Sequence, residues 1–221
     1  MKLKEIITKV KENSDSIVGE GINIGSELLL EGVAGQIAPG LVSARASYKQ
    51  RKSEERIQLA LQIMGGRLDE INAIVSRLTP TENKFVDDVV FPFVLENVSD
   101  EPEASKIQYL VNLFESIIEH RITDQELIIS YYDVLKSLRF MDIRRLIEQT
   151  PEYRERIVSN EVQLNVDLSA EGEKKRAFLK FIDNKLEQLG LIQTITFEDV
   201  PPDGPITKFG EDFIKFIKAQ V

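Results

Sequence analysis

The sequence contains no cysteine and a single histidine, His120. Without cysteine the chain has neither disulfide bonds nor thiolate ligands for a metal. One histidine leaves few routes to acid–base or metal chemistry, and no nucleophile motif accompanies His120. We therefore expect a protein that is not an enzyme and that uses no metal and no cofactor.

Long apolar runs are also missing. The longest charge-free run is Gly32 to Ala44, whereas a helix needs about 20 apolar residues to cross a bilayer. The N-terminal residues MKLKEIITKVKENSDS include no apolar core of about 7–15 residues and no small-residue cleavage site, so we expect no signal peptide. These absences predict a cytoplasmic protein.

Positive charge is in the minority. The chain has 28 Lys and Arg residues against 37 Asp and Glu residues, which gives a net charge of −9. A surface of this sign repels a polyanion, so nucleic-acid binding would require a local basic patch. The length of 221 residues and the hydrophobic content of 42% are sufficient for one or two domains with cores of their own.

The clearest pattern that is present is a heptad stripe between residues 57 and 78. Its apolar residues are spaced alternately four and three apart, as at the a and d positions of a coiled coil: Ile57, Leu61, Met64, Leu68, Ile71, Val75 and Leu78. The pattern predicts one long helix, in which Gly65-Gly66 marks a bend or a close helix contact. A stripe of about 33 Å is short for an independent coiled coil. Self-association, a protein partner and burial by the chain's own helices are therefore all open.

An apolar, glycine-punctuated segment precedes this helix and belongs to the predicted segment 1–50. Pro39 predicts a helical hairpin that turns at residues 38–40. Basic flanks at residues 2–11 and 49–52 are typical of an interfacial membrane anchor, whereas Glu20, Glu27 and Glu31 favour core packing. The side chains expected to contact a membrane, if residues 21–46 are released, are Leu28, Leu29, Leu30, Val33, Ile37, Leu41 and Val42.

Amphipathic helices fill residues 51–122, the predicted second domain. Thr79 and Pro80 predict a turn, with Thr81 as the N-cap of the following helix. Pro92 predicts a kink in that helix. Residues 99–103 combine a capping side chain, acidic residues and a proline, which predicts the start of another helix.

Residues 123–221, the predicted third domain, combine helices with short strands. Alternating apolar residues predict strands at residues 162–168, 191–197 and 206–207. This order resembles a winged-helix domain through Leu186, Leu189, Gly190, Leu191, Ile192, Ile206, Thr207, Phe209, Gly210 and Phe213. The expected fold class is therefore mainly α: a helical N-terminal domain with a long heptad-patterned helix, and a C-terminal winged-helix-like α+β domain.

The resemblance implies a role for the lysine-rich helix before the wing. In winged-helix DNA binders the third helix enters the major groove, which here implies DNA contacts from Lys174, Lys175, Arg176 and Lys180. The predicted wing, residues 198–203, is acidic and would place carboxylates beside phosphate. Protein contact is therefore the favoured role, and a DNA-binding transcription regulator is the alternative.

The front of the chain resembles bacterial and prophage proteins of the abortive-infection alpha type. The resemblance covers residues 25–119 and rests on the apolar glycine and proline stretch, the segment YKQRKSEERI and the helices in VVFPFVLENVSDEPEASKIQYLVNLFESII. It implies phage defence or prophage maintenance and brings no catalytic residues. We expect a cytoplasmic bacterial protein that acts by protein–protein contact or as an oligomer, with conditional peripheral membrane association and no small-molecule substrate.

Overall fold

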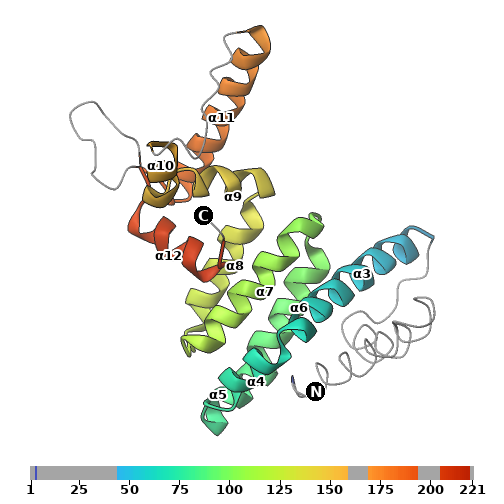
Figure 1. Cartoon of the computed structure of the whole chain (residues 1–221). Helices are drawn as coiled ribbons and strands as arrows, with labels where there is room; N and C mark the ends of the chain where they lie inside the picture. Colours follow the sequence, from blue (N-terminus) through green and yellow to red (C-terminus); the bar gives the residue numbers. More distant parts are fainter. Residues whose placement is uncertain (1–2, 4–43, 159–168, 194–204, 220–221) are drawn as a thin grey trace. The chain divides into compact units, whose positions relative to one another are not determined.

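The computed structural model describes residue 3 and residues 44–158, 169–193 and 205–219, which form a mainly helical protein (Figure 1). Every side chain predicted to contact a membrane lies outside these residues. The chain divides into two compact units, Met1–Tyr132 and Asp133–Val221. The boundary between them falls within one helix, α8 (Gln125–Ser137), whereas the sequence predicts a boundary between residues 122 and 123.

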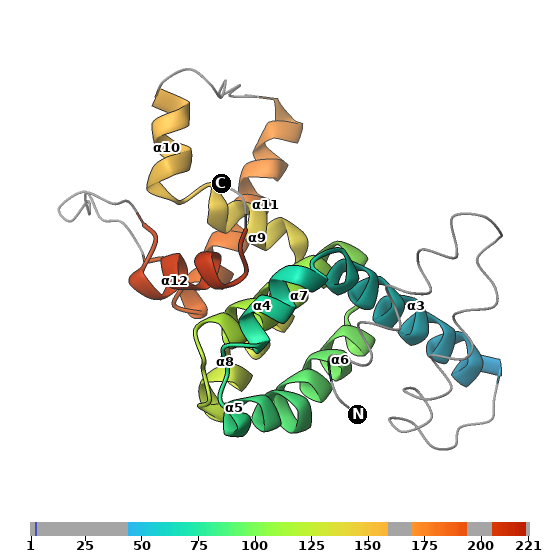
Figure 2. The same cartoon turned by 60° about the horizontal axis from the view of Figure 1, so that its bottom comes forward.

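The first unit is a bundle around α7 (Ala104–Glu119), whose residues from Leu110 to Ile118 are all buried. Besides the start of α8, its other helices are α3 (Ala44–Gly66), α4 (Leu68–Val75), α5 (Pro80–Phe85), the π-helix η1 (Val86–Val90) and α6 (Phe91–Asp100). α3 packs against both α6 and α7, and α4 packs against α7 (Figure 2). Phe91 and Phe114 meet in this core, with ring centroids 6.0 Å apart.

The heptad stripe does not lie on a single helix. α3 ends at Gly66, and Arg67 adopts φ −118° and ψ 22° before α4 begins. The Arg67 guanidinium donates hydrogen bonds to Asn112 at 2.8 Å and to Glu115 at 2.9 Å, both on α7. A Cβ added at Gly66 would have no atom within 4 Å. Gly66 therefore makes no close helix contact, and the long helix is interrupted at the adjacent Arg67.

Residues 80–100 form three consecutive helical stretches with a π-helical turn in the middle. The Phe91 amide donates to the Val86 carbonyl, five residues earlier. Pro92 has no N–H for the Asp88 carbonyl, and its ring crowds that carbonyl, so a wider turn is favoured. The helix begins with a capping box between Thr79 and Glu82. The predicted N-cap at Thr81 is therefore wrong, because Thr79 already satisfies the first free amides.

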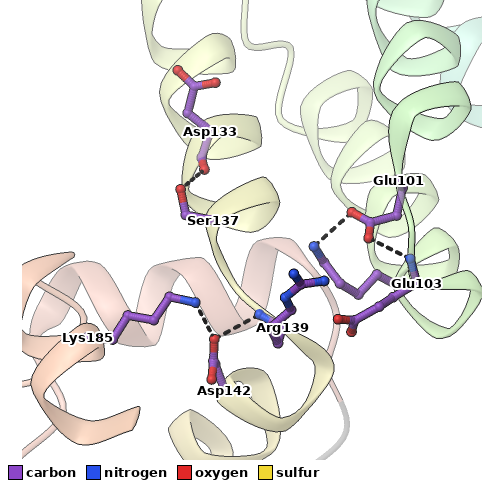
Figure 3. A network of polar contacts seen from close by, with 8 residues as sticks. Glu101, Glu103, Asp133, Ser137, Arg139, Asp142 and Lys185 are labelled. Atoms are coloured by element: carbon purple, nitrogen blue, oxygen red, sulfur yellow. Dashed lines mark hydrogen bonds and ion pairs between the residues drawn. The ribbon is translucent and has the colours of Figure 1, made fainter. Parts of the chain in front are cut away.

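A buried ion pair lies at the start of α7, where the sequence predicts a helix that begins with an N-cap side chain. α6 continues to Asp100, and α7 starts only at Ala104. Glu101 accepts a hydrogen bond from the Glu103 amide at 2.9 Å and binds the Lys106 ammonium at 2.8 Å, with both side chains only 2% exposed (Figure 3). The predicted helix start at Ser99 is wrong, because Glu101 and not Ser99 organises the turn.

The second unit contains α9 (Phe140–Ile147), α10 (Pro151–Val158), α11 (Ala170–Gln188) and α12 (Lys208–Phe216). α9 packs against the second half of α11. Arg145 binds Asp183 through two hydrogen bonds of 2.7 and 2.8 Å, which raise the pKa of its guanidinium. Asp142 accepts hydrogen bonds from the Arg139 amide at 2.8 Å and from Lys185 at 2.6 Å (Figure 3).

The described residues contain no strand, so they do not support the predicted α+β winged-helix domain. They do contain one isolated antiparallel bridge, between Ile192 and Ile206. The Gln193 amide donates to the Pro205 carbonyl at 2.7 Å beside this bridge. The predicted strand at residues 162–168 and the predicted wing at 194–204 lie outside the described residues.

α10 is a helix that the sequence analysis does not assign. Thr150 Oγ1 accepts a hydrogen bond from the Tyr153 amide at 3.3 Å, and Pro151 and Glu152 occupy the first turn. A threonine cap followed by proline and an acid is a helix-start signal. The Thr150-Pro151 pair therefore begins α10, shortly after α9 ends at Ile147.

Candidate functional site

The heptad stripe lies in the core of the first unit. Its seven side chains are between 0% and 8% exposed; six of them lie on α3 and α4, which pack against the other helices of that unit, and Leu78 follows α4. The chain's own helices therefore cover the stripe. Burial by these helices is one of the three interpretations that the sequence leaves open. In this conformation the stripe offers no surface for self-association or for a partner.

The single histidine caps a helix. His120 is the C-cap residue of α7, and its Nδ1 lies 2.8 Å from the Ser116 carbonyl oxygen. In the part of the chain that the structure describes, no three His, Cys, Asp or Glu side chains are placed to hold a metal ion. The surfaces that can bind something are therefore better sought among exposed apolar and charged side chains.

The first such surface is the first half of α11, which extends beyond α9 and α12 in Figure 1. A helix start positions it, because Ser169 Oγ accepts from the Gly172 amide at 3.2 Å. The basic residues proposed for DNA contact, Lys174, Lys175, Arg176 and Lys180, are all exposed here. The structure thus places all four on the exposed part of one helix.

Two exposed phenylalanines accompany these cations, and the sequence analysis did not select them. Phe178 is 52% exposed and Phe181 is 63% exposed, with ring centroids 6.4 Å apart and planes 21° apart. Lys174, Phe178 and Phe181 are spaced four and three apart, so they share one side of the helix. Ile182 and Leu186, further along the helix, are buried against the rest of the unit. The two rings are therefore exposed because the first half of α11 extends beyond that packing.

We name the Lys174, Phe178 and Phe181 side of this helix the α11 face. Aromatic rings that are more than half exposed are costly to keep in water, at about 25 cal/mol per Å² of apolar surface. Lys174 and the neighbouring Lys175 have no ion-pair or hydrogen-bond partner among the described residues. The α11 face is therefore an apolar patch with a basic edge.

The second surface is a groove of about 450 Å³ in the first unit, between the η1–α6 stretch and the start of α8. We name it the η1 groove. Its lining includes Asp88, Val89, Phe93, Glu96, Ile128 and Ile129. Pro92 also lines it, so the π-helical turn that precedes the proline sets which side chains reach the groove. π-turns are frequent at functional sites.

The floor of the η1 groove is rigid. Phe93 packs edge-on against Tyr132, with ring centroids 5.2 Å apart. Tyr132 is fully buried and donates its hydroxyl to the Leu110 carbonyl at 3.2 Å. Burial raises the pKa of Tyr132 well above its usual value, because a phenolate would be removed from water. The groove is therefore supported by the core.

A larger hollow of about 700 Å³ lies between α3 and the junction of α6 and α7. It is lined by Lys52, Glu55, Arg56 and Asp100, among others. Arg56 donates to the Ser99 carbonyl at 2.9 Å, and Lys52 pairs with Glu55 at 2.7 Å. Cations and carboxylates are balanced here, so this hollow selects no ligand charge.

The chain's N-terminus is attached to the first unit at one described residue. Leu3 is 1% exposed, and its amide donates to the Asp87 carboxylate at 2.9 Å. Asp87 lies in η1, next to the groove residue Asp88. The π-helical turn therefore carries both a groove wall and the anchor of the N-terminus.

Within the described ranges, every helix is too short or too polar to cross a bilayer. Comparison with known proteins gives no family to attach to these two surfaces: no protein-family model, no curated protein and no solved structure matches the chain. The inferences about function below therefore rest on the chemistry of the surfaces and on the sequence.

Proposed function

We propose that this chain is a non-enzymatic binding protein that acts by protein–protein contact through the α11 face. The observation that carries the proposal is the pair of exposed rings, Phe178 at 52% and Phe181 at 63%, beside unpaired lysines. Aromatic side chains at the centre of a patch with a polar rim are typical of protein interfaces. The partner surface that fits is apolar at its centre and acidic at its edge.

Protein contact is favoured over duplex DNA by the same two rings. A recognition helix reads base edges with polar side chains, and its cations reach the phosphates. Phe178 and Phe181 lie among these cations, so a duplex that meets the lysines would also meet two apolar rings. The net charge of −9 adds repulsion at longer range. A winged-helix regulator that binds DNA through Lys174, Lys175, Arg176 and Lys180 remains the alternative.

We also propose the cellular process in which this contact acts. The resemblance of residues 25–119 to abortive-infection alpha proteins supports a role in phage defence or prophage maintenance in a bacterial cytoplasm. The apolar stretch between two basic flanks supports conditional peripheral association of residues 21–46 with a membrane. In this scheme the α11 face meets a protein, and release of the N-terminal segment provides the response.

Photocrosslinking in living cells tests the proposal. A photoreactive phenylalanine analogue replaces Phe178 in one strain, Phe181 in a second and the exposed Lys215 of α12 in a control strain. We expect adducts at 178 and 181 that a protease digests and a nuclease does not, with none at 215. Cells are compared before and after phage exposure, because another copy of the chain and a phage protein are both candidate partners.

The other outcomes are equally definite. A nuclease-sensitive adduct at 178 and 181 would replace protein contact with the DNA-binding alternative. Absence of any adduct at both positions, in every condition, would contradict a binding role for the α11 face. Retained helicity of each substituted protein, measured by circular dichroism, establishes that the outcome concerns binding and not folding.

A further inference from the structure

The η1 groove and the α11 face have opposite charge and the same apolar character. Asp88 and Glu96 are exposed, and neither has an ion-pair or hydrogen-bond partner among the described residues. The described lining of the groove contains no Lys or Arg. The α11 face presents two rings and a lysine edge with no carboxylate between them. The acidic edges of the η1 groove and the lysine edge of the α11 face are therefore complementary in charge.

The two surfaces also match in length. Asp88 and Glu96 are eight residues apart, which is about 12 Å along a helix axis. Lys174 and Phe181 are seven residues apart, or about 10 Å along α11. An amphipathic helix that lies in an apolar groove anchors itself through side chains at this type of spacing. The α11 face is therefore about as long as the groove.

We propose that the η1 groove of one copy of this chain binds the α11 face of a second copy. Phe178 and Phe181 enter the groove against Val89, Phe93 and Ile128. Lys174 and Lys175, at one end of the α11 face, pair with the carboxylate at one edge of the groove. The inference rests on the proposed function, since it names the protein partner of the α11 face as the chain itself.

The pairing is heterologous, because the two contacting surfaces are different. A heterologous contact leaves one groove and one α11 face unused at the ends of every open assembly. Copies therefore add head to tail, and the assembly closes into a ring only if the rotation between copies permits it. A variant that lacks one of the two surfaces should not assemble with itself, although each copy still carries the other surface.

Sedimentation of purified full-length variants tests this arrangement. The face variant is Phe178→Asp with Phe181→Asp, and the groove variant is Asp88→Lys with Glu96→Lys. All four residues lie outside the buried core, so both variants should retain the helicity of the wild type. We expect the wild type to exceed the monomer mass of 25.1 kDa increasingly with concentration, and each variant alone to remain monomeric.

Mixing provides the decisive result. An equimolar mixture of the face and groove variants should give a complex of twice the monomer mass and nothing larger, because one intact groove meets one intact face. Matched controls make the same charge changes elsewhere: Met141→Asp with Gln193→Asp, and Glu70→Lys with Asp100→Lys, all at exposed positions. Both controls should assemble as the wild type does.

Two results would overturn the inference. One is a wild type that stays monomeric over about a hundredfold range of protein concentration centred on about 1 μM, the Kd of a micromolar complex. The other is a mixture of the two variants that stays monomeric although the wild type assembles. If the wild type is monomeric while Phe178 still gives a protease-sensitive adduct to a different protein in cells, the self-partner is wrong and the proposed function stands. If no adduct forms either, both fail.

Discussion

Tyr132 connects the core of the first unit to the η1 groove. Its ring supports Phe93 in the groove wall, and its hydroxyl satisfies the Leu110 carbonyl inside the bundle. A hydroxyl that is buried without a partner would cost free energy, so this hydrogen bond fixes the orientation of the ring. One residue thereby links the stability of the bundle to the shape of a binding surface.

Tyr132→Phe should lower the free energy of unfolding by about 1 kcal/mol at pH 7, because the hydrogen bond to Leu110 is lost. The pH dependence should change as well. The folded-state pKa of Tyr132 is raised, so its contribution to stability is complete below the unfolded-state pKa near 10 and is lost as the pH rises toward the folded-state pKa. Urea unfolding from pH 7 to 11 should therefore show a shallower alkaline loss for the variant. Equal alkaline slopes would contradict this account.

The ion pair between Glu101 and Lys106 is the most deeply buried charge pair among those described in the first unit. Lys106→Met should destabilise the protein by about 3–5 kcal/mol, because it leaves the Glu101 carboxylate buried without a counter-charge. Glu101→Gln combined with Lys106→Met should recover much of this loss, since no charge is then buried and Gln can still accept from the Glu103 amide. Denaturant unfolding measures both.

The matched control for the ion pair is Lys52→Met. Lys52 pairs with Glu55, but their side chains are 43% and 61% exposed. Exposed pairs contribute about 0–1 kcal/mol, so this variant should be nearly neutral. If Lys106→Met were as mild as Lys52→Met, burial would not be the source of the effect.

At the scale of elements, one close approach holds α12 to the end of α11. A Cβ at Gly210 would overlap the Leu191 carbonyl oxygen and lie 3.0 Å from Ile206 Cγ1. Thr207 caps α12 at the same place, since its Oγ1 accepts from the Gly210 amide at 3.0 Å. The first turn of α12 is therefore seated directly on the segment that follows α11.

Gly210→Ala should destabilise the second unit by several kcal/mol, because the obstacle is backbone and cannot move as a side chain does. Gly66→Ala is the control, since Gly66 is helical and a Cβ there meets nothing within 4 Å. That change should stabilise by up to about 1 kcal/mol through helix propensity. Thermal unfolding of the two variants should therefore shift in opposite directions, and shifts of the same sign would contradict the assignment.

The sequence predicts helices well where an apolar stripe and a cap coincide. The mainly helical class followed from spacing, whereas spacing left open what covers the heptad stripe. Gly65-Gly66 indicated a bend or a close helix contact, but the hydrogen bonds from Arg67 to Asn112 and Glu115 at this break join residues that are distant in sequence. The start of α7 was misplaced for the same reason: the ion pair between Glu101 and Lys106 outweighs the local capping signal at Ser99.

The surfaces were harder to predict than the helices. The basic residues of α11 were found because they are consecutive, whereas Phe178 and Phe181 look like core residues in a sequence. Only the exposure of the two rings, 52% and 63%, shows that the first half of α11 extends beyond the packing of Ile182 and Leu186. The η1 groove combines α6 with α8, and no local pattern links these helices. Exposure and long-range neighbours are therefore the information that spacing could not supply.

At the scale of the whole molecule, the N-terminal segment and the helical units can be separated experimentally. Full-length protein should float with anionic liposomes, and a deletion that starts at Arg51 should not, because it lacks the apolar stretch and its lysine-rich flank. Surface lysines contribute about 1 kcal/mol each near such a membrane. Flotation at low and high salt, with the oligomeric mass of each sample measured in parallel, checks the proposal.

A second form of the experiment uses the N-terminal anchor. Asp87→Asn weakens the acceptor of the Leu3 amide and should increase flotation of the full-length protein, while the deletion should be unaffected by the same change. Equal and weak flotation of every form, also in lysates of phage-exposed cells, would contradict membrane association. The binding role of the α11 face would not be touched by that result.

The contact between Leu3 and Asp87 also has a consequence for the order of events during synthesis. The two residues are 84 positions apart, so at roughly 5–20 residues per second the ribosome makes Leu3 about 4–17 seconds before its partner. For that interval the first unit has no site at which to bury the leucine. During that interval a lipid surface close to the nascent chain can bind the N-terminal segment before the first unit can. The rate of elongation sets the length of this interval and so influences which of the two the segment meets first.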